Sequence, residues 1–561
     1  MMMSFSLLFI GLSSLIACLG ALLVGKLVPA VSVLALVLAL GISCYLSRKM
    51  TLKLQAAPVS GPIFLLYALI FTGIYFHSVF FFFQKGPMYW IQNPFNLGDM
   101  SFHWGAINYL AEGAKFWPEN PIYLGYRFKY PFGMDFFNSI WGNLGVPISY
   151  HLPLVTLLAL LVVFYALHIT GGPLLVFAIF FSSGFYNFLV PGPWELNRMQ
   201  ESLDFKNLFL TVLLTQRGFL YALPAGVFLF RAIQKVFAGE WRPTTLEKVT
   251  LGIIWGALGF FHLHSFFFLS LYFGVLILYK RDLKNWVLPI SVASVLGFPF
   301  VINALLPETG TNSLVHLNAR GWNRAENVNP FLYWVKNLGP WIVAVVAALT
   351  IFYRKKQKDP LLYVSVAAGL FVVFMHVILA PWPWDNIKII LWCYVLALMG
   401  MSDLLWNQRK DWMKAVVFAI FFIPGMMIFV RSLPAFNKGT QWASEKELNK
   451  ARVLLKGQDV NQGLMVAPNY DHPALLLGYK LYMGYPGHVW SHGYNYVERE
   501  ALLNRVYSGD EAAIASLPKD QVGLVYRGPL EKRRENVPDT LKGLSKINEA
   551  LDHELYLVER K

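Results

Sequence analysis

The chain has 561 residues, of which 56% are hydrophobic and only 14% are charged. Soluble proteins carry about 25% charged residues, so the composition predicts a polytopic membrane protein. The net charge of +15 reflects basic loops between spans and gives no support to nucleic-acid binding. The three cysteines, Cys18, Cys44 and Cys393, lie in apolar runs and have neither disulfide nor metal-ligand spacing.

Apolar runs close to the 20 residues or so that cross a bilayer recur along residues 1–432. About thirteen spans are predicted, at residues 5–24, 28–46, 62–83, 150–169, 173–190, 218–237, 249–261, 265–279, 286–305, 331–353, 361–379, 387–404 and 412–430. The two short runs that meet near Phe261 could instead form one kinked helix.

The basic residues predict how these spans are oriented. Clusters of Lys and Arg at residues 47–53, 280–284, 354–358 and 407–414 all fall on the same side. An excess of Lys and Arg marks the cytoplasmic side. We therefore expect the N-terminus inside, and the loop 84–149 and the chain after residue 432 outside. The membrane would be the inner membrane of a bacterium or the endoplasmic reticulum of a eukaryote.

The first outward loop, residues 84–149, is a polar and aromatic segment with predicted interfacial helices. It holds two carboxylates, Asp99 and Asp135, and two cations, Arg127 and Lys129. Cations stabilise a phosphate leaving group, and a carboxylate can take the proton of an acceptor hydroxyl. This loop therefore indicates chemistry on a phosphate-bearing lipid, with the two cations as candidate substrate ligands.

Asp99 is the candidate base of this loop. It follows Gly98 and precedes an apolar helical pattern, so capping of that helix is its alternative role. His103 lies four residues further on, on the same helix face, where it could orient Asp99, contact substrate or only pack. Asp135 is either a second acid of the site or, as we favour, the partner of Arg127 in a structural ion pair.

Four cations in later outward loops depart from the positive-inside rule: Arg217, Arg320, Arg324 and Lys388. Such cations often bind anions, and guanidinium groups match phosphate well; contact with lipid headgroups is the alternative. Arg320 and Arg324, which flank a Gly-Trp pair, are the preferred donor ligands. Asp385 lies one helical turn before Lys388, so the two are predicted to form an ion pair.

His262 and His264 mark the outer end of two predicted spans. Residues two apart do not share a helix face, so this pair predicts a polar lining of the substrate cavity rather than a metal site. No metal site or cofactor is predicted; a divalent cation is compatible with the site, but nothing in the sequence indicates one.

Residues 433–561 have the composition of a soluble domain. Short β-like runs alternate with helical patterns there, which predicts a small extracytoplasmic α/β domain beside the transmembrane catalytic domain of residues 1–432. Its histidines His472, His488 and His492 lie among Tyr, Trp and Gly. These neighbours suit stacking against carbohydrate or peptide, but the core of a packed domain would have a similar composition.

Five segments, three of them in the first outward loop, carry a resemblance to a known family. GDMSFH opening a helix, GAKFWPENPIYLG after it, and YPFGMDFFNSI resemble the first outer loop of the type C glycosyltransferase (GT-C) superfamily. PWPWDNIK and MGYPGHVWSHG resemble a poorly characterised subgroup that has a C-terminal extracytoplasmic domain. The resemblance implies an enzyme that uses a lipid-phosphate sugar donor, with Asp99 at the catalytic centre. Unlike the family's Asp-x-Asp and Asp-Glu forms, Asp99 has no acidic neighbour, and two spans precede the span that leads into the loop.

The sequence therefore predicts an α-helical, GT-C-like membrane glycosyltransferase with a C-terminal α/β domain. It would move a sugar from a polyprenyl-phosphate carrier in the lipid bilayer to a glycan, lipid or protein acceptor outside the cytoplasm, with inversion. A polysaccharide polymerase or ligase would place its Arg and His in one large late loop. A secondary transporter would place ionisable residues within its spans, and a scaffold would not need basic outer loops.

Overall fold

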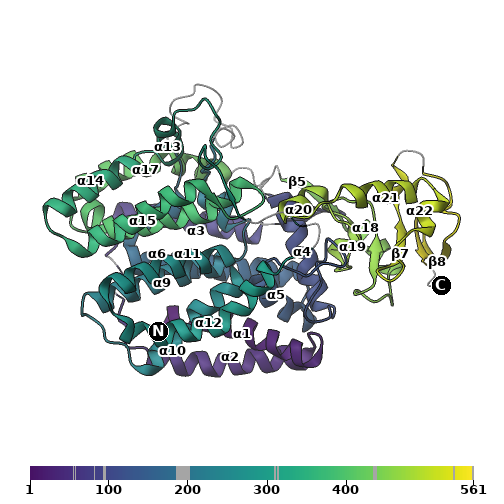
Figure 1. Cartoon of the computed structure of the whole chain (residues 1–561), viewed down its shortest axis with the longest axis horizontal. Helices are drawn as coiled ribbons and strands as arrows, with labels where there is room; N and C mark the ends of the chain where they lie inside the picture. Colours follow the sequence, from purple (N-terminus) through teal and green to yellow (C-terminus); the bar gives the residue numbers. More distant parts are fainter. Residues whose placement is uncertain are drawn as a thin grey trace.

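The computed structural model describes the chain apart from residues 55, 57, 81, 93–95, 185–202, 309, 310, 312–314, 434–438, 535, 536 and 559–561. A bundle of long helices forms the larger body, and a smaller body of helices and strands projects from one end of it (Figure 1). The bundle is built from the chain up to Ser432, and the smaller body is formed by the C-terminal residues.

Ten of the described helices are long and apolar enough to cross a membrane, or eleven if one bent pair counts as a span. The ten are α1 (Met2–Val24), α2 (Pro29–Lys49), α3 (Gly61–Val79), α6 (Ile148–Phe180), α9 (Phe219–Phe237), α11 (Leu263–Lys280), α12 (Leu283–Leu305), α15 (Lys358–His376), α16 (Ile387–Ser402) with its flanking turns η3 (Pro383–Asn386) and η4 (Asp403–Asn407), and α17 (Asp411–Ser432). The bent pair is α13 (Pro330–Leu338) and α14 (Trp341–Arg354), which meet at 99°. These helices confirm a polytopic α-helical protein.

The predicted count of about thirteen spans is not confirmed, and the differences have local causes. The helix α10 (Thr245–Phe261) has 17 residues, which is short for a span. Within α6, Gly172 has non-helical angles (φ 65°, ψ −161°). Phe164 and Phe180 would lie about 24 Å apart along a straight helix, yet their ring centroids are 6.4 Å apart. The chain therefore folds back at Gly172, and of the span predicted at 173–190 only residues 185–190 lie outside the described residues.

The runs that meet near Phe261 form two helices, α10 and α11, and not one kinked helix. His262 between them has extended backbone angles (φ −157°, ψ 95°). On its other side α10 runs parallel to α12, because glycines let the two backbones approach: a β-carbon at Gly259 would lie 2.7 Å from the carbonyl oxygen of Gly297. Small residues at such crossings are typical of membrane helices. This packing holds the α10–α11 turn at the end of the bundle that is predicted to lie outside.

The first outer loop folds against the end of the bundle. It contains the strands β1 (Phe82–Lys85) and β2 (Met88–Ile91) and the helices α4 (Leu97–Ala111) and α5 (Gly133–Asn143). The strand β5 (Thr440–Ser444), which follows α17, pairs antiparallel with β2. The short strands β3 (His316–Leu317) and β4 (Val377–Ile378) join two later outer loops, and the π-helical turn η2 (Phe209–Leu213) precedes α9.

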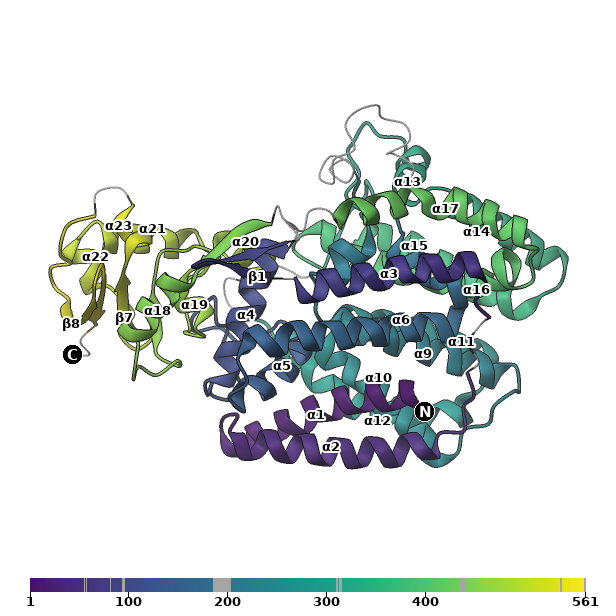
Figure 2. The same cartoon turned by 180° about the vertical axis from the view of Figure 1, so that it is seen from behind.

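The C-terminal body is a small α/β domain, as predicted. Its four-stranded sheet has the order β6-β7-β9-β8, with β6 and β7 parallel and the other pairs antiparallel. The strands are β6 (Gly463–Met465), β7 (Val522–Arg527), β8 (Ser545–Ala550) and β9 (His553–Leu557), and the helices are α18 (Glu445–Leu454), α19 (Pro473–Leu476), α20 (Pro486–Ser491), α21 (Val497–Tyr507), α22 (Glu511–Ala515) and α23 (Pro529–Lys532). Both views show α4, α19 and α20 at the junction of the two bodies (Figures 1 and 2).

Candidate active site

The helix α4 presents Asp99 and His103 at this junction. Asn96 is the N-cap residue, so the expectation that Asp99 caps the helix is wrong; Asp99 is the third residue of the first turn. It is half-buried, and burial raises the pKa of Asp99 to about 6, while His103 and Lys388 act to lower that pKa. A carboxylate with a pKa near neutrality can exchange protons at physiological pH.

His103 belongs to a buried chain of polar groups. Its Nδ1 lies 2.8 Å from Oδ2 of Asp135 on α5, and Nε of Arg217 lies 3.8 Å from the other carboxylate oxygen. Arg217 also donates from Nη2 to Oγ1 of Thr156, at 3.3 Å. Arg217 and Asp135 are each only 1% exposed. Asp135 therefore orients His103, and Arg217 balances the charge of Asp135.

Asp135 does not pair with Arg127, so the favoured prediction is wrong on that point. Arg127 and Lys129 instead hold Glu308 in the loop after α12, at 3.1 Å each. The two cations thus tie the first outer loop to a later one. The reason is geometric: Asp135 faces inward on α5, while Arg127 lies in the preceding irregular segment.

Lys388 and Asp385 form the predicted ion pair, with Nζ 3.1 Å from Oδ1. The pair stands at the start of α16, and Lys388 is only 6% exposed. Lys388 is close enough to lower the pKa values of Asp99 and His492. The structure thus brings a cation from late in the chain to the first turn of α4.

His262 and His264 hold the start of α11. Nδ1 of His262 accepts from the backbone N–H of Ser265 at 3.1 Å, and the hydroxyl of Ser265 accepts from Trp392 at 2.7 Å. Nε2 of His264 lies 3.1 Å from the carbonyl oxygen of Leu379, to which it donates. One nitrogen of each ring therefore forms a hydrogen bond that positions α11. Neither histidine belongs to a group of possible metal ligands among the described residues.

Arg320 and Arg324 turn into their own loop. Arg320 pairs with Glu326 at 3.0 Å and its side chain is 60% exposed. Arg324 donates to the carbonyl oxygens of Arg320 and Val328. Among the four cations that depart from the positive-inside rule, Arg217 lies beside Asp135 and Lys388 lies beside Asp385. The other two, Arg320 and Arg324, have partners within their own loop.

Two residues that the sequence did not assign to the site lie over it. His488 and His492, from the C-terminal domain, have ring centroids 6.0 and 4.9 Å from that of Phe102, the residue before His103. The segment MGYPGHVWSHG had drawn attention as part of the family resemblance, but no spacing along the chain could place it against α4. His472, by contrast, is a buried residue of the domain core and bonds Glu531 at 3.0 Å.

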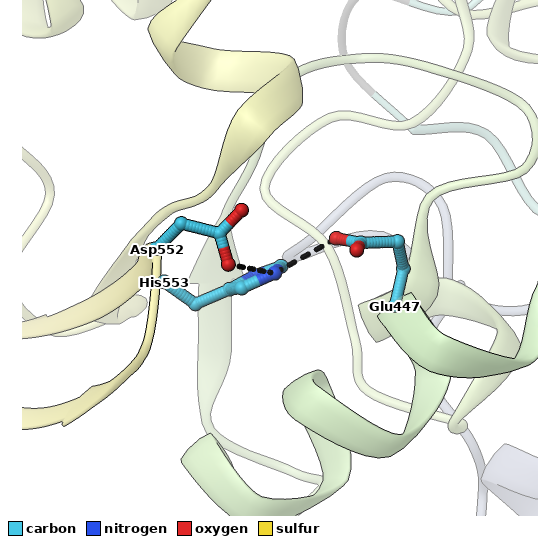
Figure 3. A group of neighbouring side chains, drawn as sticks. All are labelled: Glu447, Asp552 and His553. Atoms are coloured by element: carbon cyan, nitrogen blue, oxygen red, sulfur yellow. Dashed lines mark hydrogen bonds and ion pairs between the residues drawn. The ribbon is translucent and has the colours of Figure 1, made fainter.

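One group of three possible metal ligands occurs among the described residues: Glu447, Asp552 and His553, in the C-terminal domain (Figure 3). Nε2 of His553 lies 2.8 Å from Glu447 and 3.4 Å from Asp552. Nζ of Lys450 bonds the same two carboxylates, at 3.0 and 2.6 Å. A resident cation thus already balances this cluster, which links α18 to the turn before β9.

Three cavities of the described part lie at the opposite end of the bundle, the predicted cytoplasmic end. The most voluminous, about 750 Å³, is lined by Lys53, Arg231 and Arg242 among others. A small void of about 10 Å³ lies beside Tyr130 and Phe300.

The fold and the site define a multi-span membrane protein whose outer loops and C-terminal domain meet around a carboxylate, several histidines and a lysine. No family model and no curated protein matches the sequence.

Among solved structures, the chain is similar to arabinofuranosyltransferase AftD from Mycobacteria, at 13% identity and a TM-score of 0.49, over 91% of this chain and 41% of that chain. It is also similar to the Archaeoglobus fulgidus oligosaccharyltransferase in the apo form, at 10% identity and a TM-score of 0.38, over 82% of this chain and 69% of that chain. The chain spans about two fifths of the length of AftD, and at these scores function has to be argued from the side chains.

Proposed function

We propose that this protein is an integral membrane glycosyltransferase that moves a sugar from a polyprenyl-phosphate-linked donor to an acceptor outside the cytoplasm. The observation that carries the proposal is the position of Asp99: a half-buried carboxylate whose pKa of about 6 suits a base, within electrostatic range of the cation Lys388. The motifs of the first outer loop, which resemble the GT-C superfamily, support the same reaction.

The reaction needs one base and one anion-stabilising group. Asp99 takes the proton of the acceptor hydroxyl as its oxygen attacks the anomeric carbon. The bond from that carbon to the phosphate oxygen breaks, and the phosphate leaves with the electron pair. Lys388 stabilises the developing negative charge. A single displacement of this kind inverts the anomeric centre.

Donor binding falls to Lys388 in this scheme, since Arg320 and Arg324 have partners in their own loop. The lipid chain of the donor would stay in the bilayer while its phosphate reaches the outer end of α16. Orientation follows the charge distribution, with the C-terminal domain outside, in a bacterial inner membrane or in the endoplasmic reticulum. The chemistry requires no cofactor.

The test is an assay of the full chain in lipid nanodiscs. A panel of radiolabelled polyprenyl-phosphate monosaccharides is supplied with detergent-soluble glycoside acceptors, and labelled product is separated from donor. We expect transfer from at least one donor, lost in Asp99→Asn. A polymerase would extend preformed lipid-linked oligosaccharides instead, and a transporter would move labelled substrate into liposomes without forming a new glycosidic bond; either outcome would replace this proposal.

A further inference from the structure

The C-terminal domain is fixed firmly on the first outer loop. Backbone hydrogen bonds join residues 121–124 to residues 481–484: Leu124 donates to Leu481 at 3.1 Å, and Gly484 donates to Ile122 at 2.8 Å. The guanidinium of Arg499 lies 3.9 Å from the ring centroid of Tyr123. These contacts add to the pairing of β2 with β5, so the domain has a defined position over α4.

This position brings α20 onto the first turn of α4. A β-carbon at Gly98 would lie 3.0 Å from Nε2 of His488, which is tighter than almost all such contacts. The glycine before Asp99 therefore makes room for the imidazole. The ring of His492 lies 5.3 Å from that of Tyr130, so both histidines face the same junction as Asp99.

The two imidazoles are neutral at physiological pH. Burial lowers the pKa of His488 to about 4, and His103 acts in the same direction. Burial lowers the pKa of His492 to about 3, and His488, Lys388 and His103 add to that shift. Nδ1 of His488 is buried and has no hydrogen-bond partner among the described residues. A buried polar atom without a partner costs free energy unless a ligand satisfies it.

We propose that His488 and His492 form the acceptor side of the site, and that their ligand is the hydroxyl-bearing ring of a sugar. A neutral imidazole has one donor and one acceptor nitrogen, which matches a hydroxyl, whereas a phosphate would be better served by a cation such as Lys388. The exposed rings of Tyr485 and Trp490, 39% and 44% exposed, add apolar faces of the kind that stack on sugars.

This inference rests on the proposed function, in which Lys388 meets the donor and Asp99 takes the acceptor proton. It adds that the acceptor is a glycan, and that the C-terminal domain selects it. The domain then has a role in substrate choice, and its contacts with α4 couple that choice to the base.

The test measures binding without turnover. The full chain in nanodiscs is titrated with octyl glycosides of glucose, galactose, mannose and arabinofuranose by saturation-transfer NMR, and with undecaprenyl phosphate by tryptophan fluorescence. We expect at least one glycoside to bind, and His488→Ala and His492→Ala each to weaken it about two- to tenfold, the range for a neutral hydrogen bond. Binding of undecaprenyl phosphate should stay within about twofold of the parent.

Two further variants separate a binding role from a structural one. Ser491→Ala is the matched control, because its hydroxyl donates to a backbone carbonyl oxygen of its own helix; it should bind like the parent. His488→Asn keeps a donor and an acceptor and should recover part of the affinity, with an unchanged unfolding temperature. Three results would overturn the inference. The parent would bind no glycoside, both alanine variants would bind glycosides as the parent does, or the variants would lose glycoside and lipid-phosphate binding together. A parent that binds glycosides but transfers no sugar would refute the proposed function and leave this site standing.

Discussion

Replacing Asp99 by Asn tests the centre of the proposal, because it keeps the size of the side chain and removes its basicity. Loss of a general base costs about 10²- to 10⁴-fold in rate, which corresponds to at least about 2.7 kcal/mol of activation free energy. We therefore expect transfer by Asp99→Asn to fall by a hundredfold or more. Glu112→Gln is the control, since Glu112 is an exposed carboxylate at the other end of the same helix.

The pH dependence gives a second readout of the same residue. A base with a pKa of about 6 is only about one-tenth ionised at pH 5, so parent activity should rise about tenfold between pH 5 and a plateau above pH 7. The variant should lack this rise. Retained activity in folded Asp99→Asn, or the same pH profile in parent and variant, would remove Asp99 from the mechanism.

As the pH rises, the stability contributed by Asp99 should fall while the activity rises. The pKa of Asp99 is raised from 3.8 in the unfolded chain to about 6 in the folded protein, so the folded state favours the protonated form. That contribution is fully present below about pH 4 and is lost as the pH rises through 6. The unfolding temperature of the parent should therefore fall more between pH 4 and pH 7 than that of Asp99→Asn. At pH 7 the variant should be no less stable than the parent.

Three further outcomes are expected. Arg217→Met leaves Asp135 as an uncompensated buried charge, so the free energy of unfolding should fall by about 3–5 kcal/mol. Adding Asp135→Asn should restore most of that stability. A single variant as stable as the parent would contradict the ion pair. Lys388→Ala should weaken undecaprenyl-phosphate binding about tenfold or more, as loss of a hydrogen bond to a charged group does, whereas Arg320→Ala, in an exposed pair, should change it within about twofold; equal effects would exclude the assigned donor site. An export-dependent reporter fused after the C-terminus should be active, and one fused within residues 354–358 inactive, because the basic clusters mark the cytoplasmic side; the reverse would invert the topology.

Much of the fold could be read from local patterns in the sequence. Long apolar runs give spans because each backbone polar group in lipid must be satisfied within its own helix, and the change of composition after residue 432 separates the C-terminal domain. The reversal at Gly172 was also readable, since a Gly-Gly-Pro sequence interrupts the apolar run there. The bend between α13 and α14 was not predicted, since one span was expected at 331–353, although a Gly-Pro pair stands at the bend.

The site was predictable only where its members are neighbours in sequence. Asp99 and His103 lie one helical turn apart, and so do Asp385 and Lys388, so helix geometry alone relates each pair. The partner of Asp135 was misread, because Arg127 is close in sequence while Arg217 is close in space. Nothing local indicates that a segment of the C-terminal domain lies against Gly98, since that contact depends on how two bodies dock.

Five of the site's residues share one further feature: each stands at or near the start of a helix. Asp99 and Asp135 are third residues of α4 and α5, His264 and Lys388 are second residues of α11 and α16, and His488 is the third residue of α20. Helix N-termini carry unsatisfied N–H groups and a partial positive charge of about half a unit. Several of them around one centre favour anions there, whether side-chain carboxylates or a phosphate. Under the proposed function, a site built this way would hold the donor phosphate with few dedicated cations, in keeping with the local partners of Arg320 and Arg324.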